Sequence, residues 1–240
     1  KNIDETKSCL VTNARCLTEG IDVPTLDAVV FVDPKSSQVD IIQAVGRAIR
    51  KSDEKNLGTI VLPVLIPQET ETDFALEDST FKPIWTILKA LRSHDEILGN
   101  QLDEIRTALG RGSTKISLPE KIVISLPQDI DQIFPDLASK LSISLVERGT
   151  NSWNWWYGKL AEFAETHGHS SPLNKAAETK SLAGWVNDQR MSFNGTRNKK
   201  LSPEQCAKLE SLPNWLWNVH DSAWNSNYEK LLRYAQQKAN

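Results

Sequence analysis

The segment Gln43–Arg50, with the sequence QAVGRAIR, constrains the fold more than any other part of the chain. Its polar residues Gln43, Arg47 and Arg50 are spaced four and then three residues apart, so an α-helix places all three on one face. This face suits an anion, because each guanidinium offers a planar fork of hydrogen-bond donors. Gly46 allows an anion to approach closely. The alternative for such spacing is a solvated basic helix face.

The residues before this segment predict a parallel β-sheet. Cys9–Val11 and Ala28–Val32 are short apolar runs bounded by breakers, which is typical of buried strands. A polar loop lies between them and holds Thr12, Glu19, Gly20, Asp22 and Pro24. A strand, a polar loop, a second strand and a helix with an arginine face form the layout of a parallel sheet that binds phosphates at its carboxyl edge.

These two segments resemble two motifs of superfamily 2 helicases, the DEAD/DEAH-type group. Thr12–Pro24 follows the pattern T-x7-G-I-D-x-P of motif V, and Gln43–Arg50 follows the pattern Q-x-x-G-R-x-x-R of motif VI. The motifs occur in the family's order and at the family's distance. The alternative is a coincidence in an unrelated α/β domain.

The resemblance implies a role for each residue of motif VI. Arg47 and Arg50 would reach the γ-phosphate of ATP, with Arg50 the better candidate for an arginine finger, and Gln43 would order the same network. Such a finger stabilises the charge that develops on the transferring phosphoryl group, and its loss slows turnover by about 10³-fold or more. Gly46 would lie beside the nucleotide.

The resemblance also assigns roles in motif V. Gly20 and Asp22 would contact the nucleotide, and Thr12 and Asn13 would lie near the nucleic-acid backbone. The alternative for Asp22 is a residue that caps the turn before Pro24, which is a common arrangement.

The sequence lacks two elements that a complete helicase core needs. It has no phosphate loop of the form GxxxxGK[ST] and no DExH or DEAD tetrapeptide. In the family, both belong to a first RecA-like domain, which would bind most of the ATP and Mg²⁺. We therefore expect the chain to be the C-terminal part of a bacterial-type ATP-dependent helicase, to need that missing N-terminal domain as a partner, and to be inactive alone.

Composition limits the remaining possibilities. The net charge of −3 argues against DNA binding through bulk charge. There is no apolar run of membrane length and no signal peptide. Cys9, Cys16 and Cys206 show no CxxC spacing, which favours a reducing cytoplasm. His167 and His169 have no further ligand cluster nearby, so no metal site is expected.

The segments after motif VI predict a change from α/β to all-α structure. Leu57–Leu65 is typical of the last strand of the RecA-like domain, which we place at residues 1–68. A mostly helical connector follows at 69–150. It contains either one amphipathic helix or a helix pair broken near Gly99 over Phe81–Leu109, a strand at Glu120–Leu126 and a helix at Asp129–Glu147.

The last part of the chain contains an internal repeat rich in tryptophan. WNWWYGKLAEF at Trp153–Phe163 recurs as WNSNYEKLLRY at Trp224–Tyr234, a period of about seventy residues. The first copy predicts three helices, at Trp153–Thr166, Lys180–Arg190 and Pro203–Leu212, the last with Ser202 as its N-cap.

The first copy resembles the helicase-associated domain that follows some bacterial superfamily 2 helicases, which implies a three-helix domain at 151–219 and a truncated second repeat at 220–240. The resemblance is carried by Trp153, Leu160, Phe163, Gly168, His169, Pro172, Leu182, Gly184, Trp185, Val186, Gln189, Arg190, Leu201, Leu209 and Trp217.

We predict that this domain binds nucleic acid through Gln189, Arg190, Arg197 and Lys199. A helix end that carries Gln and Arg beside aromatic residues can clamp a phosphate and stack a base. The alternatives are that Arg190 is structural and that the tryptophans serve only to pack the core.

The sequence as a whole predicts an accessory DNA- or RNA-binding module joined to the arginine-finger half of an ATP site. One rival hypothesis is the motor subunit of a restriction system. The other is a non-catalytic module that binds nucleic acid or docks on a protein, with the helicase remnant as scaffold.

Overall fold

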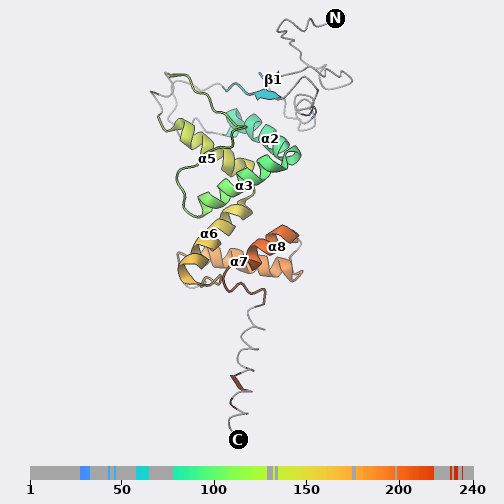
Figure 1. The fold of residues 1–240 in the computed structure, drawn as a ribbon, viewed down its shortest axis with the longest axis vertical. Helices are drawn as coiled ribbons and strands as arrows, with labels where there is room; N and C mark the ends of the chain where they lie inside the picture. Colours follow the sequence, from blue (N-terminus) through green and yellow to red (C-terminus); the bar gives the residue numbers. More distant parts are fainter. Residues whose placement is uncertain are drawn as a thin grey trace, which may run out of the picture. The chain divides into compact units, whose positions relative to one another are not determined.

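The computed structural model describes residues 28–32, 43, 46, 58–64, 78–128, 132, 135–174, 177–197, 199–218, 228, 230, 231 and 234. The chain divides into two compact units. The first unit consists of Lys1–Leu102 and Leu118–Gly149, and the second consists of Asp103–Ser117 and Thr150–Asn240. Figure 1 traces the elements of both units in sequence colours.

The first unit contains a two-stranded parallel sheet. Strand β1 (Ala28–Val30) pairs with β2 (Thr59–Val61), so that Val29 lies opposite Ile60. The Phe31 amide extends the ladder by donating to the Val61 carbonyl at 3.0 Å. The parallel pairing and the mainly helical remainder confirm the predicted fold class, part of a RecA-like sheet followed by helices. The predicted strand Cys9–Val11 lies outside the described residues.

Helix α2 (Asp78–His94) packs against this sheet through Ile87, which is buried among Phe31, Ile60, Leu62 and Leu91. Helix α3 (Glu96–Gly110) follows after one residue, Asp95. The Asp95 carboxylate caps α3 by accepting a hydrogen bond from the Leu98 amide at 3.0 Å, and it also pairs with Lys121.

The break between these helices was predicted near Gly99, and that position is wrong. Gly99 lies inside α3, and its amide donates to the Asp95 carbonyl at 2.9 Å. The break falls at Asp95 because a capping carboxylate begins a new helix there.

Helix α5 (Leu137–Gly149) lies beside α2 in the first unit (Figure 1). It begins two residues after Pro135. Gln128 and Gln132, before that proline, are helical as well, so the predicted helix at Asp129–Glu147 is interrupted near Pro135, as expected for a residue that disrupts a helix interior. The predicted strand at Glu120–Leu126 is also wrong. Residues 122–127 follow an irregular path with alternating exposure, and the described structure gives them no strand partner.

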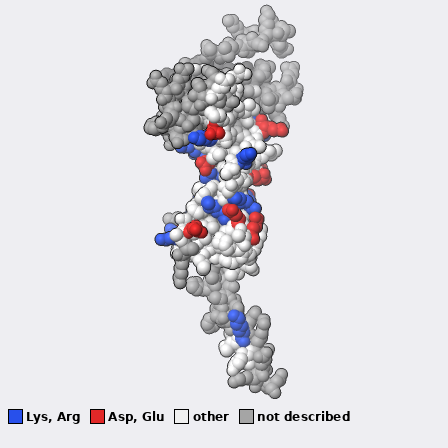
Figure 2. All heavy atoms as spheres, turned by 90° about the vertical axis from the view of Figure 1, so that its left-hand side faces the viewer, with Lys and Arg blue, Asp and Glu red and all other residues white. Residues whose placement is uncertain are grey.

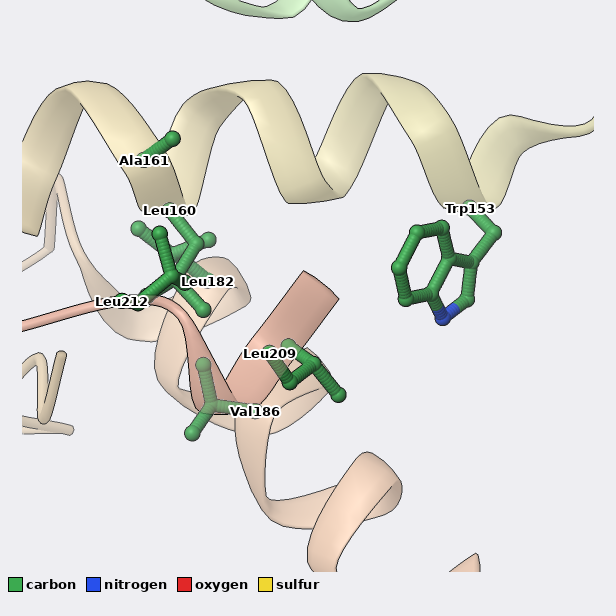
Figure 3. Packing of buried hydrophobic residues seen from close by; sticks show 7 residues of the cluster. All are labelled: Trp153, Leu160, Ala161, Leu182, Val186, Leu209 and Leu212. Carbon is green, nitrogen blue, oxygen red and sulfur yellow. The ribbon is translucent and has the colours of Figure 1, made fainter. Parts of the chain in front are cut away.

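The second unit contains α6 (Ser152–His167), α7 (Lys180–Phe193) and α8 (Pro203–Glu210). These bounds agree with the three predicted helices to within three residues. Seven buried residues from the helices and the chain after α8 form its core (Figure 3): Trp153, Leu160, Ala161, Leu182, Val186, Leu209 and Leu212.

Capping residues fix the ends of these helices. Asn151 caps α6 by accepting from the Trp153 amide at 3.1 Å, and Gly168 ends α6 in the left-handed region at φ 73°. Ser202 begins α8 through a reciprocal capping box with Gln205, and Pro203 occupies the first helical position. The predicted N-cap at Ser202 is therefore confirmed.

Two glycines let α6 touch the end of α3 that belongs to the same unit. A Cβ atom on Gly158 would lie 2.1 Å from the Thr107 carbonyl oxygen, and one on Gly110 would lie 2.1 Å from the Trp155 carbonyl oxygen. No other residue type fits at either position without moving backbone. The three-helix module is thus completed by the last two turns of α3.

None of the helices in the described part of the chain is long and apolar enough to cross a membrane.

Candidate nucleic-acid interface

Two residues of the predicted nucleotide site, Gln43 and Gly46, lie among the described residues. Gln43 and Gly46 are both helical and exposed, and a Cβ on Gly46 would meet nothing within 4 Å, while their roles in a nucleotide site stay predictions. The other predicted residues of motifs V and VI lie outside the described residues: Thr12, Asn13, Gly20, Asp22, Arg47 and Arg50. Their roles stay predictions.

Gln189 lies inside the aromatic core of the second unit, at 7% exposure. Its Oε1 accepts from the Trp153 indole Nε1 at 3.0 Å, and its Nε2 donates to the Trp185 carbonyl at 3.1 Å. The carboxamide therefore joins α7 to α6 and satisfies a buried indole N–H, which would otherwise cost free energy.

Arg190 is half-buried, and its guanidinium connects three segments. Nε donates to the Leu216 carbonyl at 2.8 Å, and Nη2 donates to Ser171 Oγ at 3.0 Å. The guanidinium carbon also lies 5.1 Å from the centre of the Trp215 ring. Burial lowers the pKa of Arg190, which nevertheless remains a cation at neutral pH. These contacts are those expected if Arg190 is a structural residue, and a contact between Arg190 and nucleic acid stays a prediction.

Arg197 and Lys199 lie in the exposed chain after α7. Arg197 Nη2 pairs with Asp188 Oδ1 at 2.6 Å, and both side chains are more than half exposed. The four residues predicted to bind nucleic acid thus divide into two that hold the core together and two that face solvent.

The exposed charges of the described residues are mixed in sign. Figure 2 shows Lys and Arg side chains interspersed with Asp and Glu on the face in view. The described residues of this face therefore form no large basic patch that would bind phosphates strongly.

A groove along α6 is a feature that the sequence did not reveal. Its volume is about 470 Å³, and it lies between one side of α6 and the start of α7. The lining residues are Trp155, Trp156, Lys159, Glu162, Phe163, Thr166, His167, Glu178, Ser181 and Leu182. The signal that could have found it is the helical spacing of Trp155 and Lys159, which lie outside the core cluster.

Aromatic rings line both ends of this groove. Trp155 and Trp156 meet edge to face with ring centres 4.8 Å apart, and Phe163 stacks on His167 at 4.1 Å. Lys159 Nζ lies 4.7 Å from the centre of the Trp155 ring. Such a surface can stack flat rings and offer one ammonium to an anion.

The two histidines of the His-Gly-His sequence are used in packing. His167 Nδ1 lies 2.9 Å from the Phe163 carbonyl oxygen, and His169 meets the Phe163 ring edge to face at 5.4 Å. Within the described ranges, no group of three or more His, Cys, Asp or Glu residues could hold a metal ion.

Comparison with known families gives two matches in one chain. Residues 1–52 match the helicase conserved C-terminal domain, and residues 150–218 match the helicase associated domain. These matches confirm the resemblance drawn from motifs V and VI and from the tryptophan pattern.

Curated relatives include the "Probable helicase A859L" of African swine fever virus, from isolate Pig/Kenya/KEN-50/1950 and from isolate Tick/Malawi/Lil 20-1/1983. Each is 37% identical over 86 residues, which is 36% of this chain and 9% of the relative. The match thus spans less than a tenth of the length of these relatives.

A solved structure, the "ATP-dependent Type ISP restriction-modification enzyme LlaBIII bound to DNA", aligns with 80% of this chain and 15% of its own chain. The TM-score is 0.44 and the identity is 24%, a likeness too weak to carry an inference.

Proposed function

We propose that the chain is the C-terminal part of an ATP-dependent nucleic-acid helicase or translocase. One observation carries the proposal: matches to a helicase C-terminal domain and a helicase-associated domain occur in order in one chain. The first match contains motifs V and VI, which are the parts of a helicase that close on a bound nucleotide.

The proposed mechanism divides the ATP site between two domains. A first RecA-like domain, outside this sequence, holds most of ATP and Mg²⁺. Closure of the two domains brings Arg47 and Arg50 to the γ-phosphate, with Gln43 ordering the network. Gly20, Asp22 and Gly46 approach the nucleotide from this chain's side.

Nucleic acid contacts two parts of the chain in this proposal. Thr12 and Asn13 lie near the nucleic-acid backbone in motif V. The helicase-associated domain adds a weak accessory contact, supported by the exposure of Arg197 and Lys199. The cysteine spacing supports a reducing cytoplasm, and a bacterial source rests on the family resemblance alone, since the curated relatives named above are viral.

The test is substitution of Arg50 in the full-length protein. Arg50→Ala should lower kcat by about 10³-fold, because the guanidinium acts on transition-state charge, while the KM for ATP changes far less. Arg50→Lys should rescue poorly, because an ammonium lacks the planar fork.

The measurement is phosphate release with DNA and with RNA present. Arg111→Ala is the matched control, because Arg111 makes only an exposed ion pair with Glu165. Equal kcat for the wild type and Arg50→Ala would exclude Arg50 from the site. The chain without its first domain should release no phosphate above background.

A further inference from the structure

We propose that the groove along α6 binds the bases of a single-stranded nucleic acid, with Trp155 as the stacking platform and Lys159 as the neighbouring phosphate contact. This inference rests on the proposed function and assigns its accessory contact to a surface other than the one predicted from the sequence.

The first argument comes from the internal repeat. Trp153 and Leu160, which are buried in the core, recur in the second copy as Trp224 and Leu231. Core positions of the helix are therefore shared between the copies.

The two tryptophans of the groove are not shared. Ser226 and Asn227 stand where the first copy has Trp155 and Trp156. A helix of this pattern thus does not require large aromatic residues there. Trp155 also lies outside the core cluster, so packing of the core does not account for it.

The second argument is the spacing along α6. Trp155 and Lys159 are four residues apart, so they lie one turn apart on the same face of the helix. Successive bases in one strand of a duplex are about 3.4 Å apart. A base that stacks on Trp155 has the indole ring in place of its neighbouring base, so it must leave the stack of a duplex, and the ligand is therefore a single strand.

The third argument is charge. Among the described residues of the groove, Lys159 is the one Lys or Arg, whereas Glu162 and Glu178 are acidic. The glutamates disfavour phosphates along the walls but can accept hydrogen bonds from the N–H groups of unpaired bases, such as the N3–H of thymine. Lys159 covers the Trp155 ring in the free protein, so a base that stacks there turns the ammonium toward a phosphate.

The test uses the whole chain and a fluorescently labelled oligothymidylate, followed by anisotropy at low salt. Trp155→Ser, which installs the residue of the second copy, should weaken binding by about tenfold or more, as expected for one lost stack. Lys208→Ala, which removes a charge that pairs with Glu204 on α8 outside the groove, should leave binding nearly unchanged. Circular dichroism of each variant checks folding.

A second probe separates base stacking from backbone binding. An oligonucleotide of the same length with abasic sugars keeps every phosphate, and it should bind the wild type about as weakly as the thymidylate binds Trp155→Ser. The salt dependence should be shallow, with a logarithmic slope of about −0.7, because one cation contacts one phosphate of a single strand.

The variant Glu178→Gln tests whether the ligand that binds in the groove is negatively charged. Removal of this carboxylate should strengthen oligonucleotide binding, by up to about fivefold for a phosphate near 4 Å in water. Weaker oligonucleotide binding in Glu178→Gln, or Trp155-dependent binding of oligolysine instead, would overturn the groove assignment.

The groove and the proposed function can fail separately. Binding of the thymidylate that is unchanged by Trp155→Ser and by loss of the bases would overturn the groove assignment and leave the accessory role intact on another surface. A folded chain that binds no oligonucleotide at low salt would overturn both the groove assignment and the accessory role.

Discussion

For Gln189, the sequence predicts the position in the helix correctly and the surroundings of the side chain incorrectly. The sequence places it near the end of a helix beside aromatic residues, which is where a phosphate clamp is expected. Its burial depends on how α6 crosses α7, and no local pattern encodes that crossing. In the structure, the Gln189 carboxamide accepts a hydrogen bond from the Trp153 indole and donates one to the Trp185 carbonyl.

Gln189→Ala should therefore destabilise the second unit by about 1–3 kcal/mol, because the Trp153 indole N–H loses its partner while it stays buried. Asn187→Ala is the control on the same helix, since Asn187 is exposed and should change stability by less than about 0.5 kcal/mol. The measurement is urea unfolding of both variants. Matching midpoints for the two variants would contradict the structural role.

Asp95 gives the first unit a dependence on pH. The hydrogen bond from Lys121, and then that from the Leu98 amide, hold the pKa of Asp95 below its ordinary value of 3.8. A carboxylate with a depressed pKa contributes stability above that ordinary value and loses it as pH falls through the folded-state pKa.

Stability of the wild type should accordingly fall as pH drops below 3.8. Asp95→Asn should reduce this fall, because an amide does not titrate there. The measurement is thermal unfolding of both proteins over a pH series from neutral to below that value. An identical acid response in the two proteins would remove Asp95 as its source.

At the scale of elements, periodicity predicted the helices but not their contacts. The apolar spacing of α6, α7 and α8 is local, so their bounds followed from the sequence. The contact between Gly158 and the end of α3 joins residues about fifty positions apart, and a glycine inside a helix signals close approach without naming the partner. In the second copy of the repeat, Glu229 stands at the position of Gly158, so that helix is not expected to make the same contact.

Gly158→Ala should lower the stability of the second unit by about 1–3 kcal/mol or more, because its Cβ would collide with backbone that cannot yield as a side chain does. Gly184→Ala is the matched control. Gly184 is an exposed residue of α7 with nothing within 4 Å of the added Cβ, so alanine should stabilise the helix by about 0.5–1 kcal/mol. Urea midpoints that move in the same direction for both variants would refute the close contact.

At the scale of the whole molecule, the order of parts was predictable and the division into units was not. Motifs V and VI and the tryptophan pattern are local signals, and family matches at 1–52 and 150–218 agree with them. The membership of Asp103–Ser117 in the second unit depends on long-range packing. The sequence therefore predicted a three-helix domain at 151–219, without the end of α3.

A fragment of residues 103–218 should be more stable than one of residues 150–218, because only the longer fragment contains the part of α3 against which Gly158 packs. The measurement is thermal unfolding of the two fragments by circular dichroism at equal concentration. Equal midpoints would restore the three-helix module as an independent folding unit.

Because of the hydrogen bond between Trp153 and Gln189, exchange of the Trp153 indole proton can be used to measure opening of the core. The Trp153 indole proton is buried and bonded, so it should exchange for deuterium only when α6 and α7 separate. The Trp217 indole proton is bonded to the exposed Glu210, and it should exchange during smaller openings. The ratio of these two exchange rates in an NMR spectrum would distinguish fraying of the surface from opening of the core, with no label added.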